Sequence, residues 1–253
     1  MVYRKKTSSR NYKRKINPFK KRNTKGMIAK QKRGQLVKLI KDTQIAESEM
    51  KYKSGTISTL SLYHNTPYEW HLWAPPGSAV GLYTLPGQGN TDGSRIGDRI
   101  YVKGFQLRAM FQISGDRRNT SIACYYVPHN TEQGSPGTYS DLFHNVTGSA
   151  MMDTLQKKKF PGIKFLGRYR VKPSDLWQHG ALNTPTSGAS IYVNTFIPID
   201  KKVYFKADAS TIPTNLKEYG TIVFVPYQNV NTLATDILSV NCDIHATCYF
   251  KDI

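Results

Sequence analysis

The positive charge of this 253-residue chain is concentrated at its N-terminus. Residues 1–41 contain sixteen Lys and Arg and no Asp or Glu, and the first acidic residue is Asp42. The whole chain has 36 basic and 17 acidic residues and a net charge of +19. Without the sixteen basic residues of 1–41, residues 42–253 have 20 basic and 17 acidic residues, a net charge of only +3. A segment with this much charge of one sign repels itself, and we expect a disordered arm that needs a polyanion as its partner.

The basic residues of the arm form clusters, with Tyr3, Tyr12 and Phe19 between them. Basic side chains neutralise phosphates and release counterions, and aromatic faces stack on bases. The alternative is a charged tail that is only solvated. We predict nucleic-acid binding by Arg4, Lys5, Lys6, Arg10, Lys13, Arg14, Lys15, Lys20, Lys21, Arg22, Lys25, Lys30, Lys32 and Arg33. The first three clusters also have the spacing of a two-part nuclear import signal, so a nuclear import receptor is a second expected partner.

The rest of the chain has the size and composition of one all-β domain. Aromatic residues make up 11% of the chain, with 16 Tyr, which favours strands, and 19 Gly and 13 Pro are typical of loop-rich β architecture. We therefore expect an arm at 1–41 and a body at 42–253. Leu36, Val37 and Ile40 have the spacing of one face of a short helix, which we expect to dock the end of the arm on the body.

Hydrophobic periodicity predicts about eight strands in the body. The clearest is 99–113, where Phe105, Leu107, Ala109, Phe111 and Ile113 share one face. A tight turn at 115–119 is expected to lead into a returning strand at 121–127. The other predicted strands are 46–53, 57–63, 163–171, 191–205, 221–227 and 240–250.

Two long loops, 64–96 and 128–161, are expected between strands. The first contains Trp70 and Trp73, whose rings are costly to leave in water. We expect them in a subunit interface or in self-packing, with base stacking as the sharper alternative. The second loop is expected to hold short helices at 141–144, capped by Ser140, and at 151–158.

The sequence favours neither a metal site nor a catalytic motif. Cys242 and Cys248 flank His245, but along a strand both Cys face one side and His245 the other, with the Cys about 20 Å apart, too far to share one zinc ion. There is no phosphate-binding loop and no nucleophile elbow. We expect no cofactor and no enzymatic activity, although carboxylates that meet only in the fold leave an enzyme as an open alternative. No apolar run is long enough for membrane insertion.

In its layout the chain resembles the capsid proteins of circovirus-like viruses, which have small circular single-stranded DNA genomes and encode a replication initiator. The resemblance is carried by the arm at 4–33, by the strand opening at 97–108, and by Phe205 and the 221–227 strand. It implies an eight-stranded antiparallel jelly roll of two packed sheets, with a disordered arm. It also implies an icosahedral shell of about sixty copies, a virion that packages single-stranded nucleic acid, DNA being favoured over RNA, and a host nuclear stage with a host import receptor.

Two rival interpretations stay open. The arm is richer in Lys relative to Arg than that of many circoviruses, which leaves the coat protein of a satellite RNA virus as an alternative. A monomeric nucleic-acid-binding regulator on a β-barrel would concentrate basic and aromatic residues on one strand face, whereas the predicted polar faces are mixed, as at Glu47 and Lys51. In a jelly roll the loops after the first and third strands leave the same end, so we expect 64–96 and 128–161 to form the outer surface or the contacts around a symmetry axis.

Overall fold

The computed structural model describes residues 18–78, 81–114, 117, 119–171, 176–178, 187–206, 213–228, 233 and 235–253. The chain divides into two compact units, residues 1–47 and 48–253, so the division falls six residues beyond the expected boundary at 41. The described residues of the first unit form helix α1 at Pro18–Glu47. The second unit, the body, holds the strands that the structure describes.

Helix α1 corrects two expectations. The short helix expected around residues 36–40 is part of a 30-residue helix, so the described part of the arm is helical rather than disordered. Pro18 at its first position has a backbone angle that suits a helix start, and Lys, Arg, Gln, Ala, Leu and Met, which have high helix propensity, fill most of its length. The strand predicted from residue 46 is wrong at its start, because α1 extends to Glu47 and β1 begins at Lys51.

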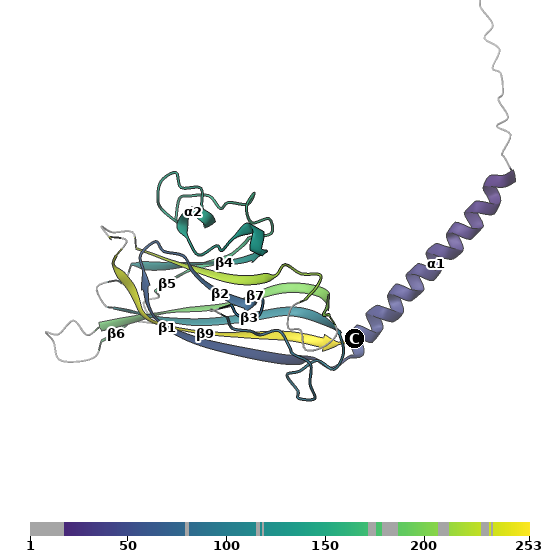
Figure 1. The fold of residues 1–253 in the computed structure, drawn as a ribbon, viewed down its shortest axis with the longest axis horizontal. Coiled ribbons are helices and arrows are strands. Elements are labelled where there is room, and N and C mark those ends of the chain that lie inside the picture. The colour runs from purple at the N-terminus through teal and green to yellow at the C-terminus, as the bar shows by residue number, and fades with distance from the viewer. Residues whose placement is uncertain are drawn as a thin grey trace, which may run out of the picture. The chain divides into compact units, whose positions relative to one another are not determined.

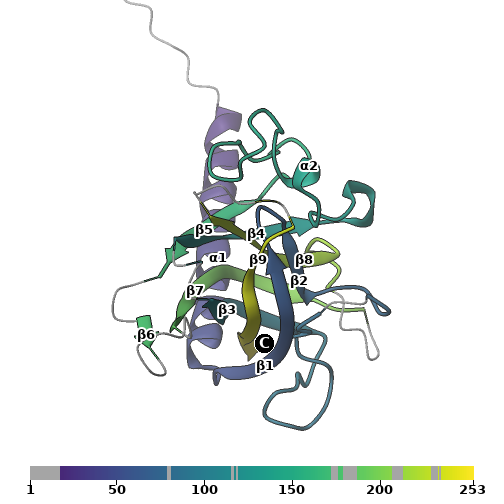
Figure 2. The ribbon, with the colours of Figure 1, turned by 90° about the vertical axis from the view of Figure 1, so that its left-hand side faces the viewer.

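The body consists of two antiparallel sheets that face each other (Figures 1 and 2). The five-stranded sheet, sheet A, has the order β1 (Lys51–Tyr63), β9 (Ile237–Asp252), β3 (Arg99–Ser114), β7 (Ser187–Tyr204) and β6 (Leu176–Gln178). The four-stranded sheet, sheet B, has the order β2 (Tyr68–Trp73), β8 (Tyr219–Gln228), β4 (Thr120–His129) and β5 (Lys164–Arg170). Apart from the short β6, four strands in each sheet with these crossovers form a jelly roll. The predicted all-β jelly-roll class is confirmed.

Alternation along the strands fills the space between the sheets. Phe105, Leu107 and Phe111 of β3 are fully buried, and they meet the buried faces of β9 and β7 in one core cluster. Cys242 and Cys248 of β9 are also buried there, as the period-two pattern predicted. Because the inner faces of both sheets are apolar, the two sheets bury one continuous apolar layer between them.

Several sequence-based predictions for the body were wrong. Residues 68–73 were expected in a loop but form β2, which pairs with β8 in register from Tyr68 opposite Phe224. The strand at 121–127 does not return beside β3; β4 lies in sheet B, between β8 and β5. Residues 151–158 form turns, not a helix. The helix expected at 141–144 exists as α2 (Tyr139–Leu142), with Thr138 rather than Ser140 at its N-cap position.

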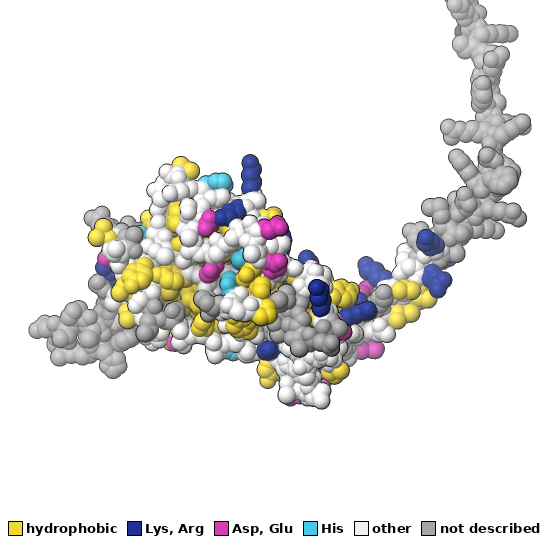
Figure 3. Space-filling model, in the orientation of Figure 1, with side chains coloured by type: hydrophobic (Ala, Val, Ile, Leu, Met, Phe, Trp, Pro, Cys, Tyr) yellow, Lys and Arg dark blue, Asp and Glu magenta, His cyan; other side chains and the backbone are white. Residues whose placement is uncertain are grey.

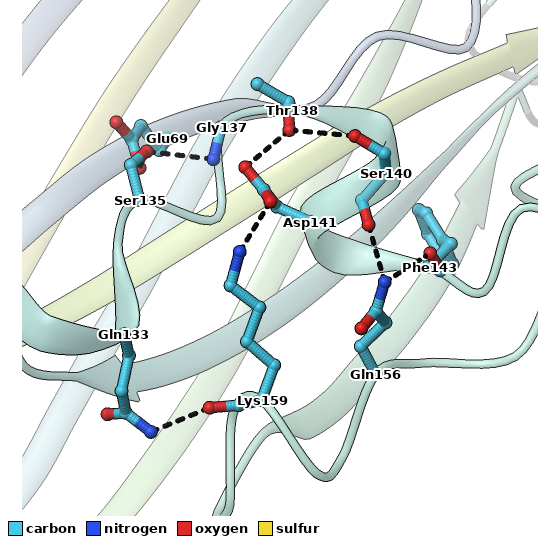
Figure 4. A network of polar contacts seen from close by, with 10 residues as sticks. All are labelled: Glu69, Gln133, Ser135, Gly137, Thr138, Ser140, Asp141, Phe143, Gln156 and Lys159. Carbon is cyan, nitrogen blue, oxygen red and sulfur yellow. Dashed lines mark hydrogen bonds and ion pairs between the residues drawn. The ribbon is translucent and has the colours of Figure 1, made fainter.

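Residues 130–163 form a structured excursion on the outer side of sheet B. Leu142, Phe143 and Phe160 are fully buried, and they pack with Val223, Val225 and other outward-facing residues of β4 and β8 in a second apolar cluster. Polar contacts hold the excursion together (Figure 4): Lys159 forms an ion pair with Asp141, and the Gln133 side chain donates to the Lys159 carbonyl at 2.7 Å. The excursion also includes a single 3-10 turn, η2 (Thr131–Gln133).

The two long connections leave sheet B at the same end. Trp73, at the end of β2, pairs with Gly220, and His129, at the end of β4, pairs with the adjacent Tyr219. The loop after β2 then runs beside β1, where Gly55 is required: a Cβ at that position would lie 1.9 Å from the Leu82 carbonyl oxygen. The two long loops were expected to leave the same end of the fold. The strand register agrees with this for the loop after β4 and for the loop after β2, whose bounds become 74–98 instead of 64–96.

Trp73 tests the core directly, because its side chain is 2% exposed and stacks on Phe105 with ring centroids 5.3 Å apart. We expect Trp73→Ala to lower the free energy of unfolding by about 3–5 kcal/mol, as large aromatic truncations in cores do. Urea denaturation of the full chain measures this. Val146→Ala, at a side chain that is 83% exposed, is the control, with an expected change within about 0.5 kcal/mol. A loss below about 1 kcal/mol for Trp73→Ala would contradict the described core.

Two buried histidines share one hydroxyl beneath the start of the excursion. The Oγ1 atom of Thr221 lies 2.8 Å from Nδ1 of His71 and 2.9 Å from Nε2 of His129. The hydroxyl has one proton, so it donates to one ring and accepts from the other, an arrangement that fits neutral rings. Burial is the main cause that lowers the pKa of both rings. For His129, repulsion from His71 adds to burial, the Asn130 backbone and the Glu218 charge oppose it, and the net result is a pKa of about 4.

This pair predicts a loss of stability in mild acid. Between pH 6.5 and about 4 the unfolded chain binds protons that folded His129 excludes, so stability is full above pH 6.5 and falls as the pH drops. One pKa unit corresponds to 1.36 kcal/mol, so His129 accounts for roughly 3 kcal/mol over this range. We expect urea denaturation at several pH values to show a flatter pH dependence for His129→Gln than for the parent protein. The exposed His144, changed to Gln, is the control; equal slopes for all three proteins would refute the assignment.

Candidate nucleic-acid interface

The described cations of the arm lie on α1. Lys30, Lys32, Arg33 and Lys38 are all exposed. At 100° per residue they point in directions of about 0°, 200°, 300° and 80° around the helix axis, so they cover its whole circumference. A helix with cations on every side can contact phosphates without one fixed docking face, which suits binding that does not read sequence.

The other predicted binding residues are only partly covered by the structure. Lys20, Lys21, Arg22 and Lys25 lie in α1. The remaining predicted residues, Arg4, Lys5, Lys6, Arg10, Lys13, Arg14 and Lys15, lie outside the described residues.

The charge and apolar pattern of α1 differs from that of an ordinary surface helix. By sequence it carries nine Lys and Arg and only two acids, Asp42 and Glu47, both near its C-terminal end. Like charges one turn apart destabilise a helix, and neutralisation by a polyanion removes this repulsion. Leu36, Val37 and Ile40 do share an arc, as predicted, but they are 57%, 43% and 50% exposed. Their docking on the body stays a prediction.

Trp70 and Trp73 are buried inside the body. The Trp70 ring lies 5.6 Å from that of Phe224, and Trp73 Nε1 donates to the Lys217 carbonyl at 3.0 Å. Side chains that are 4% and 2% exposed are not available for a base or for a second subunit. We expected these residues either in a subunit interface or in self-packing. Their burial corrects the interface assignment and supports self-packing.

On the body, positive and negative side chains compensate one another. Ion pairs join Lys51 to Asp252 at 2.8 Å and Lys103 to Asp200 at 2.7 Å. Lys159 in turn pairs with Asp141, which lowers the pKa of that carboxyl. The space-filling view shows both signs of charge on the body, whereas dark-blue side chains stand along the described part of the arm helix (Figure 3).

Catalytic and metal chemistry gain little support from the fold. Within the described residues, no three His, Cys, Asp or Glu side chains are grouped so that they could hold a metal ion. The three thiols are buried, and burial raises their pKa, which disfavours reactive thiolates. The fold does bring His71 and His129 together. This contact could not be predicted from the sequence, because 57 residues separate the two histidines and no motif links them.

Among the described helices, none is both long and apolar enough to span a bilayer.

Comparisons with known proteins give structural matches only. No family model and no curated protein matches the chain. Among solved structures, the chain is similar to Desmodium yellow mottle tymovirus, with 11% identity, 81% of this chain and 88% of that chain covered, and a TM-score of 0.29. The chain is also similar to Mud crab tombus-like virus, with 10% identity, 81% of this chain and 82% of that chain covered, and a TM-score of 0.32. For the 60-mer BFDV capsid protein the identity is 12%, 81% of this chain and 94% of that chain are covered, and the TM-score is 0.28.

Jelly rolls of two four-stranded sheets occur in viral capsid proteins, and also in lectins and cupins. Because TM-scores near 0.3 carry no argument about function, any role for this chain has to be argued from its own residues.

Proposed function

We propose that the chain is a structural capsid protein, whose jelly-roll body forms a closed shell from many copies and whose arm binds a single-stranded genome. The observation that carries the proposal is the division of charge: sixteen cations without an acid at residues 1–41, and +3 over the rest. Such an arm serves a shell protein, because the shell gathers many arms around one polyanion. The body needs no charge of its own for that task.

The charge is of the right size for a small genome. With about sixty copies, sixteen charges each give roughly 960 positive charges inside one shell. That number neutralises a large part of a genome with one to two thousand phosphates. The arm needs no base contacts for this role, and the cations around α1 suit contacts with phosphates alone.

The proposal extends to the class of virus. The layout of the arm and strands supports a circovirus-like virus with a single-stranded DNA genome, whose capsid protein enters the host nucleus through its clustered basic residues. A satellite RNA virus coat protein fits the same body and arm. The two are told apart by the nucleic acid that co-purifies with the assembled protein.

Removing residues 1–33 tests the role of the arm. We expect the truncated protein still to form particles or pentamers, because the body makes the shell, but to retain no nucleic acid. Negative-stain electron microscopy together with the ratio of absorbance at 260 and 280 nm measures both properties. Truncated particles that package nucleic acid as the full chain does would show that the arm has another role.

Neutralising three arm cations tests the contact itself. For the triple variant Lys30→Gln, Lys32→Gln, Arg33→Gln, we expect the slope of log K against log salt concentration for a single-stranded oligonucleotide to fall by about 2. Each phosphate contact on a single strand contributes about 0.7 to that slope. Fluorescence anisotropy across a salt series gives the slope.

The matched control removes three exposed charges from the body, through Lys157→Gln, Lys158→Gln and Lys164→Gln. We expect its slope to equal that of the parent protein. If both triple variants lose the same amount of slope, binding depends on total charge and not on the arm.

A further inference from the structure

A cleft of about 590 Å³ opens between the two sheets, at the end of the body where β2 and β4 finish. Sheet B contributes Trp73 of β2 and Tyr126 of β4, whose side chains are 2% and 5% exposed. Sheet A contributes Pro198 and Ile199 of β7. The volume is within the range of cavities that hold small organic ligands.

Much of the wall of this cleft is apolar. Ile199 and Leu216 both pack against the core cluster between the sheets. Pro128, Pro161 and Pro198 also line the cleft, and proline has no backbone N–H to donate. An apolar body can therefore be buried here without leaving backbone donors unpaired.

The polar side chains of the wall at 213–217 already have partners. Thr214 Oγ1 donates to the Tyr204 carbonyl at 3.1 Å, and Asn215 Nδ2 donates to the Lys202 carbonyl at 2.7 Å. The Asn215 amide oxygen in turn accepts from the Tyr204 N–H at 3.1 Å. The cleft thus offers few groups that could recognise the polar edge of a base.

Three lysines, Lys164, Lys201 and Lys217, line the same cleft, and none of the residues that line it is Asp or Glu. Lys164 and Lys201 are exposed and Lys217 is half-buried, whereas Trp73 and Tyr126 are buried, so the lysines surround the mouth of the cleft. Within the described part of the chain, no ion pair involves any of the three.

The acidic residues next to these lysines in the sequence have other partners. Asp200 forms an ion pair with Lys103 at 2.7 Å. Glu218 accepts a hydrogen bond from the Thr131 N–H at 2.9 Å. Hydrogen bonds from Thr131 are the main cause that lowers the Glu218 pKa, and the charge of Lys217 is the smallest. Positive charge at the mouth is therefore left for a ligand.

Two of the lysines occupy positions on the inner faces of the sheets. Lys164 of β5 lies directly opposite Tyr126 of β4, and Lys201 of β7 lies opposite Val102 of β3. Residues opposite each other in antiparallel strands have side chains on the same face, and Tyr126 and Val102 belong to the core between the sheets. Inner-face positions of a sandwich are normally apolar, so a cation from each sheet at one cleft indicates an anion between them.

The hydroxyl of Tyr126 supplies an independent sign of a ligand. The residue is 5% exposed and lines the cleft, yet its hydroxyl has no hydrogen-bond partner among the residues that the structure describes. Burial raises the pKa of this hydroxyl, so it stays protonated and can donate. A buried hydroxyl without a partner costs free energy, which an acceptor inside the cleft recovers.

We propose that this cleft binds a long-chain carboxylate, whose head group accepts hydrogen bonds from Tyr126 and the surrounding lysines and whose alkyl chain lies against the apolar wall. The inference goes beyond the proposed function, since it concerns the body alone. A ligand held between the two sheets stabilises the folded body by mass action. A mononucleotide is the rival ligand, and it is disfavoured because the polar groups of the wall are already bonded.

Isothermal titration calorimetry of the full chain with dodecanoate tests the cleft. We expect one molecule bound per chain, at least tenfold more tightly than octanoate, because each buried CH₂ group contributes about fourfold. Dodecyltrimethylammonium has the same chain and the opposite charge, and we expect it not to bind. We expect the same of thymidine monophosphate.

The variants separate the head-group contacts from packing. Tyr126→Phe keeps the ring and removes the hydroxyl, so it should weaken dodecanoate binding about tenfold or more. It should leave the melting temperature of the ligand-free protein unchanged, because the hydroxyl has no partner to lose. The double variant Lys164→Gln, Lys201→Gln should weaken binding at least as much. The control is Lys157→Gln, Lys158→Gln, which removes two exposed charges outside the cleft and should bind as the parent protein does.

Four results would overturn the proposal. Dodecanoate that does not bind shows that the cleft holds no such ligand. Equal affinities for dodecanoate and dodecyltrimethylammonium assign the binding to apolar surface without an anion site. Tighter binding of thymidine monophosphate makes the cleft a nucleotide site. If Tyr126→Phe and the Lys164, Lys201 double variant both bind as the control does, the carboxylate binds elsewhere. None of these results involves the arm, so the proposed function stands or fails separately.

Discussion

Repulsion among sixteen positive charges is the constraint that shapes this molecule. A folded core cannot contain such a segment, because buried cations need partners that the segment lacks. The chain therefore divides into an arm, helical over Pro18–Glu47, and a body that needs almost no net charge. The repulsion costs free energy until a polyanion relieves it, and that cost drives nucleic-acid binding in the proposed function.

The body is held by the opposite kind of interaction, the removal of apolar surface from water. Its two sheets meet over fully buried residues such as Phe105, Phe111 and Phe224, and the excursion at 130–163 buries a second, smaller cluster on sheet B. Both depend on register, since a slip by one residue would turn each inner side chain outward. The jelly roll thus leaves the outer face of sheet A for polar and charged groups.

The parts of the fold that could be predicted from the sequence are the long strands in which apolar and polar residues alternate. The strands β3, β7 and β9 were found because their apolar positions repeat over more than ten residues. In contrast, β2 has only six residues, within a segment rich in Pro and Gly, and its Trp-rich pattern is not periodic. The pairing of β4 with β8 and β5 could not be predicted either, because these partners lie about 100 and about 45 residues away, respectively.

The candidate functional residues also divide into those that could be predicted from the sequence and those that only the fold brings together. The arm could be found from composition alone, since its charge is local in sequence. The contact of His71 and His129 with Thr221 could not, because β2 and β4 are brought together only through β8, which lies between them in sheet B. The sequence predicted that Trp70 and Trp73 lie either in a subunit interface or in self-packing, and their burial in the body supports self-packing.

The mass of the full chain in solution with single-stranded nucleic acid, after nuclease digestion, tests the account most directly. Sedimentation velocity should show a megadalton particle that retains protected nucleic acid, because the body assembles into a shell and the arms hold the polyanion inside it. A species near 28.6 kDa with no protected nucleic acid, under conditions in which the protein is folded, would contradict the account.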